Sequence, residues 1–530
     1  MFNDNLKLGE TMLPSIFNDI IGPVMRGPSS SHTAASWRIA RVCLDILNEP
    51  LRNALVEFDK AGAWATNYRE QGTAMGMNGG LLGLEITDPR MKDTEQVMAE
   101  RDLSIKYEIA SFPTHHVNTV RIFLTGIYGK SIEVYAASLG GGSFNVYRID
   151  DHQVDIRGDY HELLVRTQNS GSILESIDAL IPHIAQLDQS AGKNDVLINV
   201  KSPEKIPDEI IEHITNFPLT EGAIVVHPVL PIISGNDTGL PFKDLKSLVK
   251  YAEKENYSLG DIGLIYEKCL SGLPEAALLA KMQDIIKVID KSIHTGFEGT
   301  VFEDRILHHQ SHLIKKAENE KKILPDSIVN KIIAYVTAIM EVKSALEVFV
   351  ANPTAGSCGT VGGVLKAISE ELKSSEGELI KSYFAAGIVG AYFAAGPGFS
   401  AEEHGCQVEC GAASGMAAAA MVQLLGGTAR QAIDAASMAI QNMIGLICDP
   451  VADRVEVPCL GKNINAAVNA YASANMVRSG FDAVIPLDEV IETVFRVGKQ
   501  MPSCVKCTGK GGLAITNTGT ELKRKLESGS

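Results

Sequence analysis

Three cysteines with unusual neighbours mark the stretch of this chain that best fits metal binding. Cys406 follows a glycine, Cys448 precedes an Asp-Pro pair, and Cys459 follows a proline. Glycine lets the backbone pass close to a bulky group, and proline fixes a backbone angle so that a thiolate is held in place. Thiolates from separate loops are typical ligands of zinc or of an iron–sulfur cluster. The alternative is three buried free cysteines, which pack as small apolar groups.

A second stretch, from Ser29 to Thr33, is suited to binding an anion. Gly27 and Pro28 cannot lie inside a helix, whereas residues 36–47 have helical apolar spacing. The residues between them therefore lie at a helix N-terminus, where unpaired N–H groups and hydroxyls can hold a carboxylate. Ordinary capping of the helix is the alternative. The same argument applies to a later turn of small residues, at Thr354 and Gly356.

The size and charge of the chain exclude several classes of protein. With 530 residues it is too long for one core, so two or three domains are expected. The net charge of −16 argues against nucleic acid or an anionic membrane as a partner. Residues 1–10 show no signal pattern, and no apolar run reaches the roughly 20 residues of a membrane span. Nine cysteines, an odd number with seven of them after residue 350, do not suggest a secreted disulfide framework, so a reducing cytoplasm is expected.

The pattern of apolar residues divides the chain into three domains and a linker. Residues 1–155 alternate short strands and helices, which indicates an α+β domain. Residues 156–230 form a separate α+β pattern, and residues 231–243 are rich in Gly, Pro and Asp, as a linker would be. Residues 244–530 have mainly helical spacing. Within them, the Ala- and Gly-rich runs at 385–395 and 412–425 predict tightly packed buried helices.

Short motifs spread over nearly the whole chain resemble those of the iron–sulfur-dependent L-serine dehydratases, in the order of that family. They are GPSSSHT from Gly27, NPTAGSCG from Asn352, GCQ at Cys406, CDPV at Cys448, VPC at Cys459 followed by Asn463, and the run from Met501 through GGLA. The resemblance implies a single-chain form with an N-terminal substrate-binding part and a helical cluster-binding part. It implies a 4Fe–4S cluster held by Cys406, Cys448 and Cys459, with one iron open for substrate, and no pyridoxal phosphate. A homodimer is usual in the family.

The function implied by the resemblance is the conversion of L-serine to pyruvate and ammonia, with the open iron acting as a Lewis acid on the hydroxyl. A fourth thiolate would close that iron, so Cys410 is interpreted as a packing residue. Lys506 is expected as a polar group near the site. The matched motifs assign substrate binding to Ser29, Ser30, Ser31, His32, Thr33, Gln71, Asn118, Thr354 and Gly356.

One motif departs from the family pattern. Gln71 stands where the family usually carries a histidine considered a catalytic base, and a glutamine cannot take a proton at neutral pH. The histidines that remain in matched motifs are His32 and His116. His32 adjoins the expected carboxylate seat, where a positive charge would help binding, so His116 is the expected base.

Residues 156–230 resemble an ACT domain, a βαββαβ module that binds amino acids in many metabolic proteins; a plain linker domain is the alternative. Two other functions stay open for the whole chain. The first is a lyase for another small amino acid, such as an L-cysteine desulfidase or an enzyme for a larger β-hydroxy amino acid. The glutamine at position 71, in place of the family histidine, is the reason to consider it. The other is an amino-acid sensor that holds a cluster or zinc, although the GPSSSHT seat argues against it because a sensor would have little need of it.

Overall fold

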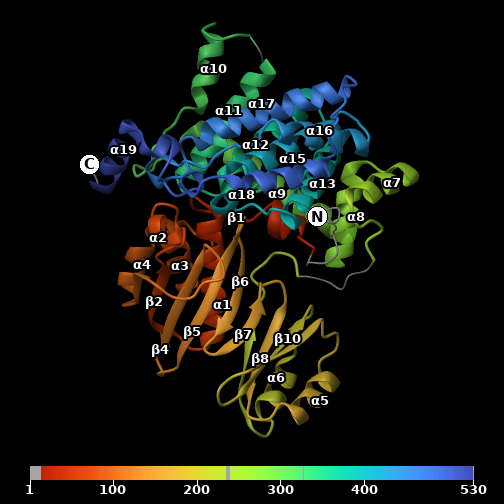
Figure 1. Ribbon diagram of the computed structural model, residues 1–530. Helices are drawn as coiled ribbons and strands as arrows, with labels where there is room; N and C mark the ends of the chain where they lie inside the picture. The colour runs from red at the N-terminus through yellow and green to blue at the C-terminus, as the bar shows by residue number, and fades with distance from the viewer. Residues whose placement is uncertain (1–12, 234–238, 326, 529–530) are drawn as a thin grey trace.

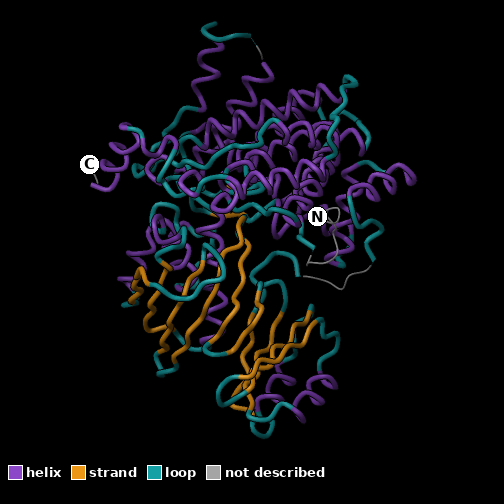
Figure 2. Tube along the Cα trace, in the orientation of Figure 1, coloured by secondary structure: helices purple, strands orange, loops and turns teal. Residues whose placement is uncertain are grey.

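The computed structural model describes residues 13–233, 239–325 and 327–528, so residues 1–10 and the middle of the expected linker lie outside the described residues. Figure 1 shows two β-sheets below a large block of helices, with the smaller sheet at the end away from that block. Figure 2 shows the same division, with strands gathered in the lower half. This mixed architecture with a helical C-terminal part confirms the coarse fold prediction.

The larger sheet is mixed and has the order β3-β2-β4-β5-β6-β7. β2 and β3 run parallel, and the other neighbouring strands are antiparallel. Alternate residues of β4 (Val120, Ile122 and Leu124) are buried in one core with residues of the helices α1 and α3. The strands are β2 (Leu51–Asp59), β3 (Ser104–Ala110), β4 (Thr119–Gly126), β5 (Ser131–Gly140), β6 (Ser143–Ile149) and β7 (His152–Ile156), and the helices are α1 (Ala35–Leu47), α2 (Trp64–Asn67), α3 (Thr73–Leu81) and α4 (Thr94–Glu100).

The smaller sheet is antiparallel, with the order β11-β8-β10-β9. Along the chain its elements follow the βαββαβ order. The apolar pattern does not reveal β9, because this edge strand is mostly polar and exposed. The elements are β8 (His161–Thr167), α5 (Gly171–Leu180), β9 (Gln186–Ala191), β10 (Val196–Ser202), α6 (Asp208–Thr215) and β11 (Thr220–Val226).

The helical block is built around α13 and α15, whose Ala- and Gly-rich sequences are buried on nearly all sides. The prediction of tightly packed buried helices is confirmed there. No helix in the described ranges is long and apolar enough to cross a membrane. The helices are α7 (Leu245–Glu255), α8 (Leu259–Ser271), α9 (Glu275–Glu298), α10 (Ser311–Asn319), α11 (Ser327–Ser344), α12 (Cys358–Leu372), α13 (Glu376–Ala395), α14 (Ala401–His404), α15 (Cys410–Leu424), α16 (Ala429–Gln441), α17 (Cys459–Arg478), α18 (Leu487–Gln500) and α19 (Asn517–Ser528).

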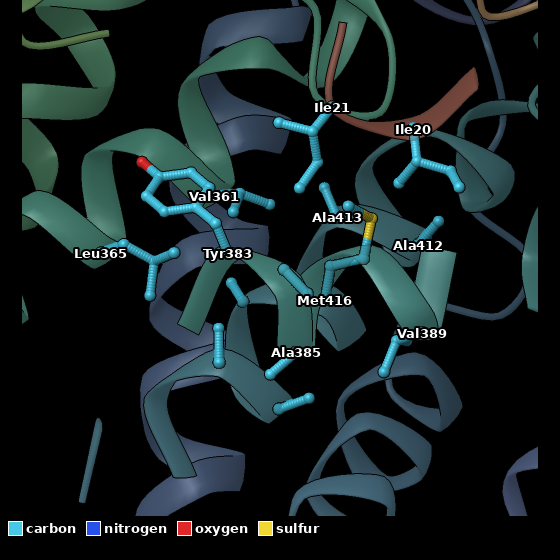
Figure 3. Packing of buried hydrophobic residues seen from close by; sticks show 14 of the residues in the cluster. Ile20, Ile21, Val361, Leu365, Tyr383, Ala385, Val389, Ala412, Ala413 and Met416 are labelled. Carbon is cyan, nitrogen blue, oxygen red and sulfur yellow. The ribbon is translucent and has the colours of Figure 1, made fainter. Parts of the chain in front are cut away.

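The first described residues pack inside this helical block before the chain enters the larger sheet. Figure 3 shows Ile20 and Ile21 among side chains of α13 and α15, such as Val389 and Met416. The next residues form β1 (Val24–Met25), which pairs antiparallel with β12 (Phe349–Val350). The two predicted anion seats, which begin a few residues after these short strands, also meet: the Ala355 N–H donates to Ser30 Oγ at 3.2 Å.

Candidate active site

Four cysteines that are far apart in sequence gather at one buried place. Cys406, Cys448 and Cys507 share a small apolar cluster with Ala401. The Cys448 side chain hydrogen-bonds to both Cys406 and Cys507, and these bonds, together with burial, raise the pKa of its thiol well above the usual value. Cys459, the first residue of α17, is electrostatically coupled to Cys406, and burial raises the pKa of its thiol to about 12.

A buried carboxylate lies against these thiols. The Sγ atoms of Cys406 and Cys448 and a carboxylate oxygen of Glu409 all lie within 4.8 Å of one another. Burial raises the pKa of Glu409 to about 7, although the Thr354 hydroxyl donates to its Oε1 at 2.7 Å. A Cβ on Gly356 would lie 2.7 Å from the same Oε1. Glycine at 356 is therefore what lets the carboxylate approach this backbone.

Lys462 supplies a positive charge on the other side of Cys406. Its Nζ lies 3.8 Å from Cys406 Sγ and donates to Asp449 Oδ1 and to the Ile447 carbonyl, each at 2.7 Å. Burial alone would lower the pKa of Lys462, but the neighbouring Cys406 and Asp449 outweigh burial and raise it. An adjacent ammonium group favours the thiolate form of a cysteine, which is the form that binds metals.

The predicted carboxylate seat lies at the N-terminus of α1, as expected, and forms the short helical turn η2 (Ser30–Ala34) that precedes this helix. The Ser31 hydroxyl donates to Glu402 Oε1 at 2.9 Å, and the Ser400 hydroxyl donates to Glu402 Oε2 at 3.0 Å. Glu402 lies in α14, four residues before Cys406. The seat and the cysteine segment, more than 350 residues apart in sequence, therefore meet through this carboxylate.

His32 is fully buried and bonded at both ring nitrogens. Its Nε2 lies 3.1 Å from Asn67 Oδ1, and its Nδ1 lies 3.1 Å from the Ser29 and Ser31 hydroxyls. Because Asn67 Oδ1 only accepts, the proton belongs on Nε2 and the Nδ1 lone pair faces the hydroxyls. Burial lowers the pKa of His32 even though Glu402 opposes the shift, so the ring is neutral at pH 7.

His116 lies just before β4, beside the carboxylate of Glu403. Its Nδ1 accepts the Asn118 backbone N–H at 3.1 Å, and its Nε2 lies 3.8 Å from Glu403 Oε2. This geometry assigns the proton of the neutral ring to Nε2. The His116 hydrogen bond lowers the pKa of Glu403, with a smaller contribution from the charge of Lys506.

Asn118 is buried, and neither end of its side-chain amide has a hydrogen-bond partner among the residues that the structure describes. A buried unpaired polar group costs about 1–3 kcal/mol. Such an amide is suited to a ligand that brings its own donor and acceptor.

Gln71 also lies at the cysteines. Its Nε2 donates to Cys507 Sγ at 3.4 Å, and its backbone carbonyl accepts the Thr33 hydroxyl at 3.3 Å. Cys507 is held by backbone bonding, since its N–H donates to the Cys448 carbonyl at 3.0 Å. The position expected to carry a histidine therefore faces a thiol in this chain.

Comparison with known proteins agrees with this geometry. The family model described as "Serine dehydratase alpha chain" matches residues 128–514. This chain belongs to the serine dehydratase alpha chain family. It is 34% identical over 289 residues to the probable L-serine dehydratase alpha chain of Bacillus subtilis, which covers 54% of this chain and 96% of that protein. It is 32% identical over 317 residues to L-serine dehydratase 1 of Escherichia coli, which covers 58% of this chain and 69% of that protein.

The donor set of this serine dehydratase family member fits an iron–sulfur cluster or another soft metal centre. Buried thiols from separate elements converge beside a lysine, and sulfur ligands select iron–sulfur clusters or zinc. Cys410 is buried near enough to Cys406 and Cys459 for their charges to raise the pKa of its thiol further, beyond the effect of burial, and Asn463 Nδ2 lies 3.8 Å from its Sγ. Asn463 also donates to the carbonyls of Gly356 and Cys459 at 2.7 and 2.9 Å, so it joins the second anion seat to the α17 cysteine.

Several residues at this site were not singled out from the sequence. Glu402 and Glu409 flank Cys406 in AEEHGCQVEC, and charged residues between glycine and alanine runs are the signal that could have revealed them. Cys507 forms a CxxC pair with Cys504, a spacing that by itself suggests a redox or zinc motif. In the structure Cys504 is exposed and Cys507 is buried, so the two thiols have different environments.

Proposed function

We propose that this protein converts L-serine to pyruvate and ammonia by dehydration and deamination. The relatives that it matches carry the name L-serine dehydratase. The observation that carries the proposal is the bond from Ser31 to Glu402, which links a carboxylate seat to a cysteine centre. The seat would bind the carboxylate of an amino-acid substrate. A metal centre held by the cysteines would assist the loss of hydroxide, which is a poor leaving group.

Cys406, Cys448 and Cys459 would hold a 4Fe–4S cluster. When bound, the cluster supplies an iron that acts as a Lewis acid on the substrate hydroxyl. Lys462 would place its positive charge beside the Cys406 thiolate, and Asp449 holds Lys462 in this position. Glu409 stays hydrogen-bonded to Thr354, so it remains close to the thiols without replacing one of them.

Substrate would lie between the two anion seats. The N–H groups and hydroxyls of Ser29 to Thr33 would bind its carboxylate, with Thr354 and Gly356 on the facing turn. The unpartnered amide of Asn118 would bind a further polar group of the substrate. The neutral ring of His32 would orient the hydroxyls of Ser29 and Ser31. Gln71 would face the substrate from the side of Cys507.

His116 is the proposed general base for the Cα proton. The ring would accept this proton at Nδ1, in place of the hydrogen bond from the Asn118 N–H, while its Nε2–H stays directed at Glu403, whose negative charge would stabilise the imidazolium. Lys506 contributes positive charge near Glu403. After the proton and the hydroxide leave, the enamine becomes an imine, and water releases ammonia and the 2-oxo acid.

A 2-oxo-acid assay on anaerobically prepared protein tests the proposal, with L-serine, L-threonine and L-cysteine as substrates. We expect pyruvate from L-serine at a rate well above the other two. A second candidate function is a lyase for another small amino acid. It is favoured because Gln71 occupies the position of the family histidine. Faster hydrogen sulfide release from L-cysteine would select that candidate, and no 2-oxo acid from any substrate would reject both.

We further propose that residues 156–230 act as an ACT-like regulatory domain, that the enzyme is a homodimer, and that it works in the cytoplasm. The βαββαβ order of the elements supports the ACT-like domain. The homodimer is supported by the dimers that are usual in the family. Seven of the nine cysteines lie after residue 350, unlike the cysteines of a secreted disulfide framework, and this supports a reducing compartment. Light scattering of the purified protein would measure its mass in solution and test the dimer.

A further inference from the structure

A second group of potential metal ligands lies far from the cysteines, where the two sheets meet. Asp151 lies in the turn before β7, His152 begins β7, and Asp195 lies in the hairpin between β9 and β10. One ligand atom from each residue lies within 4.8 Å of the other two. His152 Nε2 is 3.1 Å from Asp195 Oδ1 and 3.5 Å from Asp151 Oδ1.

The histidine is oriented so that its free nitrogen points at the carboxylates. The His152 ring is fully buried, and its Nδ1 lies 3.0 Å from the Ser190 carbonyl. A carbonyl only accepts, so Nδ1 carries the proton and Nε2 presents a lone pair. Within the described residues, Nε2 has no hydrogen-bond partner. Three lone-pair atoms thus face one another, an arrangement that a cation stabilises.

The outer contacts of the three side chains follow the pattern of a metal site. Metal-binding histidines usually donate their other N–H to a carbonyl or carboxylate, as His152 does to Ser190. The second oxygen of Asp151 accepts the Lys193 N–H at 2.8 Å, and the second oxygen of Asp195 lies 3.6 Å from Arg166. These contacts leave one oxygen of each carboxylate directed at His152.

The spacing of the ligand atoms suits a small divalent ion. Tetrahedral zinc, with bonds of roughly 2.1 Å, separates its ligand atoms by roughly 3.4 Å. The two separations from His152 Nε2 lie on either side of that value. A Cβ on Gly192 would lie 2.9 Å from His152 Nε2 and 2.8 Å from Asp195 Oδ1. The glycine therefore leaves free the space that faces the ligand atoms.

We propose that Asp151, His152 and Asp195 bind one divalent transition-metal ion of the zinc type, which clamps the hairpin of the smaller sheet to the larger sheet. Two of the ligands come from the edge of the larger sheet and the third from the β9–β10 hairpin. Asp151 is partly exposed, so the fourth position is open to water. The site is separate from the cysteines and does not depend on the proposed reaction.

Counting bound zinc in matched variants tests this site. Cluster-loaded protein is incubated with zinc chloride under anaerobic conditions, desalted and measured by elemental analysis. We expect wild type to retain one equivalent more than Asp195→Asn. The control is Asp188→Asn, which changes an exposed carboxylate of β9 and should retain the wild-type count. Zinc taken up by other cysteines counts equally in all three proteins and cancels in the difference.

A milder variant guards against misfolding of Asp195→Asn. Asp151→Asn changes a partly exposed ligand, and we expect it to bind zinc at least about tenfold more weakly than wild type. Zinc should also raise the thermal midpoint of wild type more than that of Asp151→Asn. Equal zinc counts in wild type and Asp195→Asn would overturn the proposal and leave an ordinary ion pair between protonated His152 and the two carboxylates.

Discussion

At the scale of single residues, the charges at the cysteine centre depend on one another. Burial holds Glu409 and Cys459 toward their neutral forms, hydrogen bonds with Cys406 and Cys507 do the same for Cys448, and Lys462 beside Cys406 favours a thiolate. A bound cationic centre would reverse this balance, because it stabilises thiolates that the protein alone disfavours. On the proposed ligand set, formation of the thiolates and binding of the centre would therefore occur together.

Substitution of the ligands gives the first prediction. Cys406→Ala, Cys448→Ala and Cys459→Ala should each lose the visible iron–sulfur absorption of anaerobically prepared protein or leave a degraded cluster. Cys504→Ala is the matched control, since its thiol is exposed. Cys410→Ala should keep the cluster largely intact. Full absorption and activity in all three ligand variants would show that the ligand set is wrong.

The base gives the second prediction. His116→Ala should lower turnover of L-serine by about 10²–10⁴-fold, the usual loss for a general base, without changing the cluster spectrum. Gln71→His, which restores the residue usual in the family, should raise L-serine turnover if the glutamine weakens the site. Turnover that survives in His116→Ala and disappears in His32→Ala would instead assign the base to His32.

At the scale of elements, the sequence predicted those with strong apolar periodicity. The helix over residues 36–47 appears as α1, and the buried helices at 385–395 and 412–425 appear within α13 and α15. The apolar pattern does not reveal β9, since an edge strand with polar residues such as Gln186 and Asp188 has no periodicity to detect.

The sequence predicted the site less completely than the elements. Motifs indicated the cysteines and the seat, but the contacts of Ser31 with Glu402 and of Gln71 with Cys507 join residues distant in sequence. Local spacing carries no information about such contacts. The same reason explains why the first described residues, expected in the N-terminal domain, pack inside the helical block.

Packing of α13 gives the third prediction. A Cβ on Gly387 would lie 2.6 Å from Ile16, inside the core that Figure 3 shows in part, so Gly387→Ala should destabilise the protein by about 1–3 kcal/mol. Gly377→Ala, on the same helix, has open space around the new methyl group and should be neutral or stabilising by up to about 1 kcal/mol. Thermal unfolding followed by circular dichroism measures the difference, and equal midpoints would contradict the packing argument.

At the scale of the whole molecule, α1 connects the smaller sheet to the candidate active site. Its first turn follows the Ser29–Thr33 seat, and its last turns contact the smaller sheet through β11. Val226 of β11 lies in the same core as Ile46 of α1. Near the end of α1, Asp45 Oδ2 accepts the His227 N–H at 2.8 Å, just after β11. A change in the smaller sheet can therefore reach the substrate seat along one helix.

This connection gives the last prediction, which tests regulation by residues 156–230. An amino acid bound there should change the turnover of wild type, and Asp45→Ala should reduce that change at least about threefold, because it removes a contact between α1 and the smaller sheet. Turnover without effector should stay close to wild type, since Asp45 lies at the end of α1 away from the seat. Asp208→Ala, an exposed change on α6, is the control and should keep the full response. Initial rates at fixed L-serine over a series of effector concentrations measure this, and calorimetry shows whether binding itself persists. A full response in Asp45→Ala would mean that the effect does not travel through this contact.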